Sequence, residues 1–95
     1  MGFVDVYSKV TLPCELNTFS DRARWSFTDE NFKYHQDLYY DLTGRFRVVA
    51  VHGQRFLEVN PIQLQDSGYY RCYTESGNIL QSCYVNVVGT STIFI

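Results

Sequence analysis

This 95-residue sequence has no cluster of basic residues and no long apolar run. Its net charge is −2, so nucleic acid is not expected as a partner, nor is an anionic membrane surface. A membrane-spanning helix needs a run of about 18 apolar residues, and the sequence contains none. The segment from Met1 to Asp5 also lacks the basic and apolar regions of a signal peptide. We therefore expect a domain that makes no membrane contact of its own.

Motifs for catalysis and for cofactor binding are also missing. There is no Ser-His-Asp order, no paired carboxylates in a plausible cleft and no glycine-rich phosphate loop. Zinc sites use close ligand pairs such as Cys-x-x-Cys, whereas Cys14, Cys72 and Cys83 are far apart or unpaired. His35 and His52 lack metal-ligand spacing and are interpreted as solvated loop residues. We expect no enzyme activity, no cofactor and no metal site.

The residues that are abundant favour β-sheet. Eight tyrosines and seven phenylalanines stand against one methionine, and aromatic side chains fit a pleated surface well. No window has a clear 3.6-residue apolar period. Strand-like segments recur every eight to twelve residues with turn residues between them, which is typical of an all-β sandwich or barrel. The length suits one domain with one core.

Apolar alternation predicts where the strands lie. The expected strands cover residues 10–16, 22–27, 45–51, 55–60 and 79–88, with short irregular edge strands within 32–40. His52-Gly53-Gln54 is expected to form a hairpin loop. Ile62 and Leu64 are expected to close one end of the core.

The stretch from Asp66 to Cys72 reads as a turn followed by a strand. Side chains alternate along a strand, so Tyr70 and Cys72 share one face. The residues predicted on the opposite face are Tyr69, Arg71 and Tyr73. Cys14, on the inward face of the first strand, is the natural disulfide partner for Cys72. Closing the long loop between Cys14 and Cys72 stabilises the fold by roughly 4 kcal/mol in the chain-entropy description.

Cys14, Trp25 and the pattern Asp66-x-Gly68-x-Tyr70-x-Cys72 together resemble the immunoglobulin superfamily. The resemblance extends over about residues 4–88. It implies an immunoglobulin-like two-sheet antiparallel β-sandwich of the V-type, with about nine strands in a single domain over residues 1–88. Residues 89–95 would then be a linker or the remnant of a stalk.

The same resemblance implies roles for individual residues. Arg45 would open strand D and pair with Asp66 before strand F, and Trp25 would pack over the disulfide. Tyr70 would be the tyrosine corner, with its hydroxyl bonded to the backbone of the E–F connection. The Phe-Gly-x-Gly motif of rearranged antigen receptors is absent, and so is a second cysteine pair in the C–C′ region. The resemblance therefore indicates a V-set-like domain of a non-rearranging immune-type receptor.

The implied function is non-catalytic recognition in the extracellular space, as the ectodomain of a membrane protein or as a secreted form. The partner would be a protein ligand, a co-receptor or a second copy of the domain. In such domains strands G, F, C, C′ and C″ form a sheet whose outer face commonly docks partners, and Tyr and Arg concentrate binding energy. The candidate binding residues are Tyr34, Tyr39, Tyr40, Tyr69, Arg71, Tyr73, Glu75 and Asn78.

Two questions stay open at this level. A hairpin turning at Ser76-Gly77 places Cys83 opposite Tyr70 as a buried free thiol, whereas a one-residue bulge turns it outward, where it could form an interchain disulfide. We favour the buried thiol, because unpaired cysteine behaves as a small core residue. The lack of an Asn-x-Ser/Thr sequon keeps an adhesion or scaffold module, including a muscle-filament-type spacer, as the alternative function. Arg45 with Asp66, and the tyrosine-rich segment before them, argue against that alternative.

Overall fold

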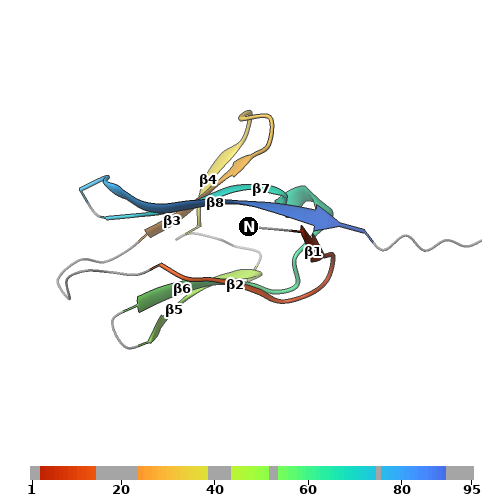
Figure 1. Ribbon diagram of the computed structural model, residues 1–95, viewed down its shortest axis with the longest axis horizontal. Coiled ribbons are helices and arrows are strands. Elements are labelled where there is room, and N and C mark those ends of the chain that lie inside the picture. Colours follow the sequence, from red (N-terminus) through yellow and green to blue (C-terminus); the bar gives the residue numbers. More distant parts are fainter. Residues whose placement is uncertain (1–2, 15–23, 39–43, 52–53, 75, 90–95) are drawn as a thin grey trace, which may run out of the picture.

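The computed structural model of the protein describes residues 3–14, 24–38, 44–51, 54–74 and 76–89. The chain forms two β-sheets packed face to face, as Figure 1 shows. One sheet has the strand order β1-β8-β7-β3-β4 and the other β2-β6-β5. The elements are β1 (Phe3–Asp5), β2 (Val10–Leu12), β3 (Arg24–Asp29), β4 (His35–Asp37), β5 (Phe46–Val51), β6 (Gln54–Val59), the 3₁₀ turn η2 (Leu64–Asp66), β7 (Gly68–Tyr73) and β8 (Ile79–Val88).

The predicted all-β class and the two-sheet architecture are confirmed. The described residues contain eight strands, against the nine or so expected. One pairing also differs from the expected antiparallel arrangement, because β1 runs parallel to β8, with Val4 opposite Val87. A parallel pair needs a long crossover connection. Here the whole chain between the first and last strands supplies it.

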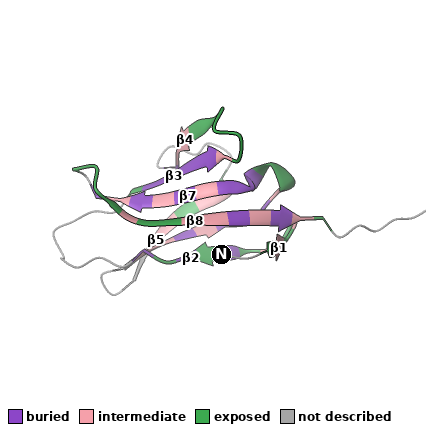
Figure 2. Cartoon of the chain, turned by 45° about the horizontal axis from the view of Figure 1, so that its top comes forward, coloured by how far each residue is buried: buried purple, intermediate pink, exposed green. Residues whose placement is uncertain are grey.

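The core lies between the sheets, and β7 contributes to it by strict alternation. Along β7, Gly68, Tyr70 and Cys72 are buried while the residues between them are half-buried, and Figure 2 shows this alternation as bands along the strand. Residues below 2% exposure come from both sheets: Leu12, Cys14, Trp25, Leu57, Val59, Ile62, Tyr70, Cys72 and Val85. Burying large aliphatic and aromatic side chains stabilises the fold by about 1.5–3 kcal/mol each.

The predicted disulfide between Cys14 and Cys72 is present and links the two sheets. Its Cα atoms are 6.2 Å apart and both cysteines are fully buried. Trp25 lies directly opposite Cys72 in the β3–β7 ladder and is only 1% exposed. Trp25 and the disulfide thus belong to the same central cluster of the core.

Two placements predicted from the sequence are wrong. Leu64 is 55% exposed, and Ile62 alone of that pair closes the core. The reason is the 3₁₀ turn η2, in which the buried residue is Asp66. His35 is exposed, as expected, but it opens strand β4 instead of lying in a loop. His52 and the predicted glycine of the β5–β6 hairpin loop lie outside the described residues.

Within the described ranges, no helix is long and apolar enough to cross a bilayer.

Candidate functional site

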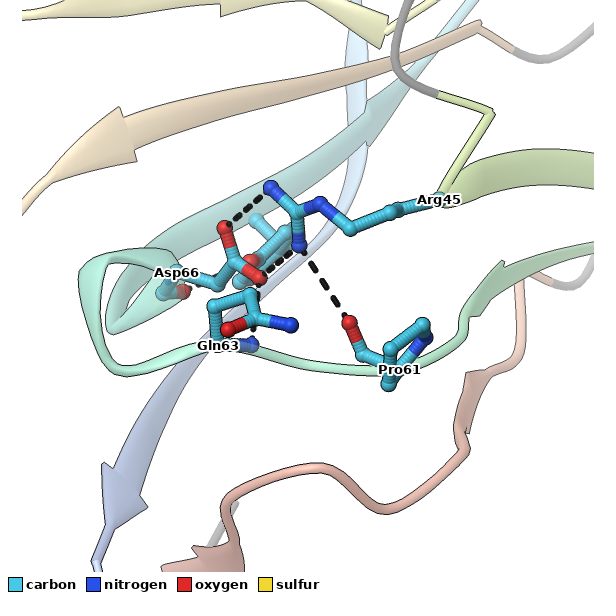
Figure 3. Close-up of polar contacts among 5 residues, drawn as sticks. Arg45, Pro61, Gln63 and Asp66 are labelled. Carbon is cyan, nitrogen blue, oxygen red and sulfur yellow. Dashed lines mark hydrogen bonds and ion pairs between the residues drawn. The ribbon is translucent and has the colours of Figure 1, made fainter.

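Arg45 and Asp66 form the ion pair that fastens the start of β5 to the turn before β7 (Figure 3). Arg45 Nη1 and Nη2 donate to the two carboxylate oxygens of Asp66, the second bond being 3.1 Å long. The Pro61 carbonyl oxygen accepts a longer bond of 3.4 Å from Nη1. Asp66 is 3% exposed, so its charge depends on Arg45 and on the Gln63 N–H, which donates to Oδ2 at 2.7 Å.

Tyr70 completes this structural cluster from the neighbouring strand. Its hydroxyl donates to the backbone carbonyl oxygen of Asp66 at 2.6 Å, and its ring packs at 5.0 Å from that of Phe27. Burial, followed by the nearby Asp66 charge, raises the pKa of Tyr70 far above its ordinary value. Tyr70 therefore keeps its hydroxyl proton near neutral pH. The bond between Tyr70 and Asp66 is a structural one.

The outer face of the five-stranded sheet carries the side chains that do not face the core. Tyr69, Arg71 and Tyr73 of β7 are half-buried on this face, as their alternation predicted. In the ladder, Tyr69 lies between Thr28 of β3 and Tyr84 of β8. The neighbours of Arg71 in the ladder are Ser26 and Ser82. Serine side chains are small, so Arg71 extends farther from the sheet than its neighbours do.

Three rings form a continuous aromatic row on this face: Phe32, Tyr69 and Tyr84. The Phe32 ring stacks on Tyr69 with centroids 5.1 Å apart, and Tyr84 packs on the other side of Tyr69 at 5.0 Å. The Arg71 guanidinium lies over the Tyr69 ring at 5.8 Å, within the range of a cation–π contact. Phe32 is 64% exposed, so the row presents a large apolar ring to solvent.

One end of the aromatic row is acidic. The Tyr84 hydroxyl donates to Glu30 Oε2 at 2.6 Å, and this bond raises the pKa of Tyr84 because it stabilises the neutral phenol. Beside the row, Thr28 Oγ1 and His35 Nδ1 are 3.0 Å apart and share a hydrogen bond. The face thus combines aromatic area with hydrogen-bonding groups on both sides.

The turn between β3 and β4 holds Phe32 in an uncommon backbone conformation, with φ of 58°. Non-glycine residues rarely have positive φ, and bulky ones are outliers there. The Phe32 N–H donates to the Asp29 carbonyl oxygen at 2.9 Å. The Asp29 carboxylate Oδ1 accepts the N–H groups of Lys33 and Tyr34 at 2.7 and 2.8 Å. These bonds maintain the strained turn that places the Phe32 ring over Tyr69.

Tyr34 lies elsewhere, apart from the outer face where it was grouped with the β7 residues. It packs near Phe27, with ring centroids 6.4 Å apart, and its hydroxyl donates to Gln36 at 3.1 Å. Gln36 is opposite Phe27 in the ladder and shares its inward side. Strand alternation therefore directs Tyr34 toward the gap between the sheets, although it is 54% exposed.

The remaining candidate binding residues do not all lie on the outer face. Tyr73 is opposite Arg24 on the outer face, and partial burial raises its pKa. Asn78 shapes the β7–β8 tip: its N–H donates to Thr74 Oγ1 at 3.1 Å and its carbonyl oxygen accepts from the Thr74 N–H. The candidates outside the described residues are Tyr39, Tyr40 and Glu75.

Cys83 lies opposite Tyr70 in the β7–β8 ladder, the register expected from the hairpin. It is a free thiol, half-buried and packed against the core cluster. Near the tip, Tyr73 pairs with Ile79, which is one residue off the register of a turn at Ser76-Gly77. A β-bulge between Cys72 and Tyr73 restores that register, and Cys83 therefore faces inward. Burial raises the pKa of its thiol, which keeps it protonated near neutral pH.

Phe32, Tyr84 and Glu30 were missed as face residues. Tyr84 had a usable signal, because Cys83 was expected to face inward and its neighbour in the strand must then point outward. Phe32 had no such signal, because its position depends on a turn with positive φ that no local sequence motif predicts.

The opposite outer face, on the three-stranded sheet, is different in kind. Glu58 accepts a 2.8 Å bond from Arg47 Nη2 and has Lys9 3.8 Å away. These charges satisfy one another. Across the described ranges, no group of three or more His, Cys, Asp or Glu side chains could hold a metal ion.

The sequence matches no protein-family profile, and no significant match is found among curated proteins.

Proposed function

We propose that this chain is a V-type immunoglobulin-like recognition domain that binds a protein partner outside the cell, without catalysis. The observation that carries the proposal is the aromatic row of Phe32, Tyr69 and Tyr84, with Arg71 over its centre. Tyrosine and arginine are enriched among residues that dominate binding energy at interfaces. Phe32 is exposed, and a strained turn holds its ring against Tyr69 in this row.

The sheet topology supports the immunoglobulin-like part of the proposal. In the proposal, the order β8-β7-β3-β4 would correspond to strands G, F, C and C′, and β2-β6-β5 would correspond to B, E and D. The disulfide would then join strands B and F, with Trp25 on strand C beside it. The Tyr70 bond to the Asp66 carbonyl has the form of a tyrosine corner.

The disulfide also supports a location outside the cell. Stable disulfides form in oxidising compartments and are rare in the cytosol. In the proposal the domain is the ectodomain, or a soluble form, of an immune-type cell-surface receptor. A protein ligand, a co-receptor or a second copy of the chain would dock on the outer face of the five-stranded sheet.

The test compares single alanine variants in a binding assay with fluorescent multimers of the domain on a panel of leukocytes and other cells. Phe32→Ala and Arg71→Ala are expected to lower binding at least tenfold while thermal unfolding stays cooperative. Tyr7→Ala is the matched control, because Tyr7 is also an exposed aromatic, 69% accessible, with φ of 69°. Equal binding by all three variants would reject the assignment of the face and favour a linking or spacing module.

A further inference from the structure

A hollow of about 420 Å³ opens between the two sheets beside the Arg45–Asp66 pair. It is separate from the aromatic row, because its lining residues point inward or belong to the turns at that edge of the sandwich. Its size falls within the range of small-molecule sites, about 300–1,000 Å³. The structure therefore contains a concave surface that the proposed docking face does not use.

The apolar part of the hollow's wall is aromatic. Phe27 from β3, Tyr34 from the β3–β4 turn and Phe46 from β5 line it. The face of an aromatic ring carries negative charge density and attracts cations. The hollow already shows this preference, because the Arg45 guanidinium carbon lies 5.0 Å from the centroid of the Phe46 ring.

The charges lining the hollow leave one carboxylate over. Arg45 and Asp66 neutralise each other through two hydrogen bonds. Asp29 is the remaining charged residue of the lining, and among the described residues it has no ion-pair partner. Within the part of the chain that the structure describes, the hydrogen bonds to the Asp29 carboxylate use Oδ1 alone, and they fix the carboxylate in place. Gln36 and Gln65 add amide groups that accept hydrogen bonds.

We propose that this hollow binds an organic cation: an ammonium or guanidinium group carried on an apolar body. Asp29 binds the cation, and the rings of Phe27, Tyr34 and Phe46 enclose the apolar part. An anion is disfavoured, because the charges of the lining sum to −1. A neutral apolar molecule of the same shape forgoes the charge-assisted hydrogen bond to Asp29. The chemistry is shared by small amines and by a lysine or arginine side chain of a partner.

The experiment titrates ¹⁵N-labelled protein with three probes of one shape: phenethylamine, 2-phenylethanol and phenylacetate. Phenethylamine is expected to shift the backbone resonances of Asp29, Tyr34 and Gln36 with a dissociation constant in the millimolar range, as expected for so small a ligand. The neutral alcohol is expected to bind about tenfold more weakly and the anion not measurably. A titration with Nα-acetyl-lysine methylamide separates the sources. If phenethylamine alone binds, the site takes a small amine, and if both bind, a partner's side chain can occupy it.

Asp29→Asn tests the assigned residue. Asparagine Oδ1 still accepts the N–H groups of Lys33 and Tyr34, so the turn is kept while the charge is removed. Phenethylamine affinity is expected to fall about tenfold in this variant. Asp5→Asn, which removes an exposed carboxylate on β1, is the control and should bind as the wild type does. Equal affinity for the amine and the alcohol, or an absence of saturable shifts in the wild type, would overturn the proposal whether or not any variant folds.

Discussion

Tyr70 donates its hydroxyl hydrogen to the carbonyl oxygen of Asp66, and this one bond ties the middle of β7 to the turn that precedes it. The same aspartate uses its carboxylate to hold Arg45 from the other sheet. The turn η2 is therefore fixed through both the backbone and the side chain of a single buried residue. Changes at Tyr70 and at Arg45 should have effects of different size.

Tyr70→Phe is expected to lower the free energy of unfolding by about 1–2 kcal/mol at pH 7, because the buried Asp66 carbonyl loses its donor. Chemical denaturation monitored by Trp25 fluorescence measures this. The difference should narrow as pH rises above 10.0, the ordinary tyrosine pKa. Burial raises the pKa of Tyr70 in the folded state, so ionisation favours the unfolded chain of the wild type only. A constant difference across this range would contradict the assignment.

Arg45→Ala is expected to cost more, about 3 kcal/mol, because it leaves the buried Asp66 carboxylate without its cation. Arg45→Lys should recover part of this loss, since lysine keeps the charge but cannot make the two-pronged contact. The free energy of unfolding of each variant is measured by urea denaturation, monitored by Trp25 fluorescence. Equal stability of the alanine variant and the wild type would show that the pair contributes nothing to folding.

Gly68→Ala is expected to prevent normal folding. A Cβ added at Gly68 would lie 2.4 Å from the Thr28 carbonyl oxygen and 2.8 Å from Phe27 Cε1, so β3 and β7 could not keep their spacing. Gly77→Ala is the comparison, because its Cβ meets open space and only its φ of 95° is unfavourable. We expect a loss of about 1–2 kcal/mol for Gly77→Ala and no cooperative transition for Gly68→Ala.

Cys83 is expected to react slowly with iodoacetamide in the folded protein and quickly in urea, since burial raises its thiol pKa and restricts access. Mass spectrometry under non-reducing conditions should find one alkylated cysteine per chain after unfolding. The raised pKa also means that Cys83 contributes stability below pH 9.0, which is lost as pH rises further. Cys83→Ala should reduce this alkaline loss. A disulfide-linked dimer through Cys83 would contradict its inward placement.

Sequence patterns predict this fold best where one side chain per two residues is apolar. The alternation around Tyr70 and Cys72 predicted both faces of β7, and the hairpin at Ser76-Gly77 predicted the pairing of Tyr70 with Cys83. β1 was harder, because three residues on the sheet edge carry too short a pattern. Leu64 was misplaced because a 3₁₀ turn changes which residue faces inward.

The candidate site was predicted only in part, for physical reasons. Tyr69 and Arg71 followed from period-two alternation. The position of Phe32 depends on the strained turn that the Asp29 carboxylate closes. Tyr34 lies in the same turn, and the side on which it points depends on how the turn leads into β4. Both are properties of turn geometry, which spans few residues and has no repeating period. The hollow beside Arg45 requires two sheets in contact and has no local signature.

The bulge between Cys72 and Tyr73 has a consequence for how the β7–β8 tip can vary. It takes up one extra residue on β8, and the pairs nearer the centre are Cys72 with Gln81 and Tyr70 with Cys83. Because side chains alternate along a strand, removing that extra residue without a change in the tip would turn Cys83 to the outer face and Tyr84 to the core. The length of the tip and the composition of both faces of β8 are thereby coupled through the bulge.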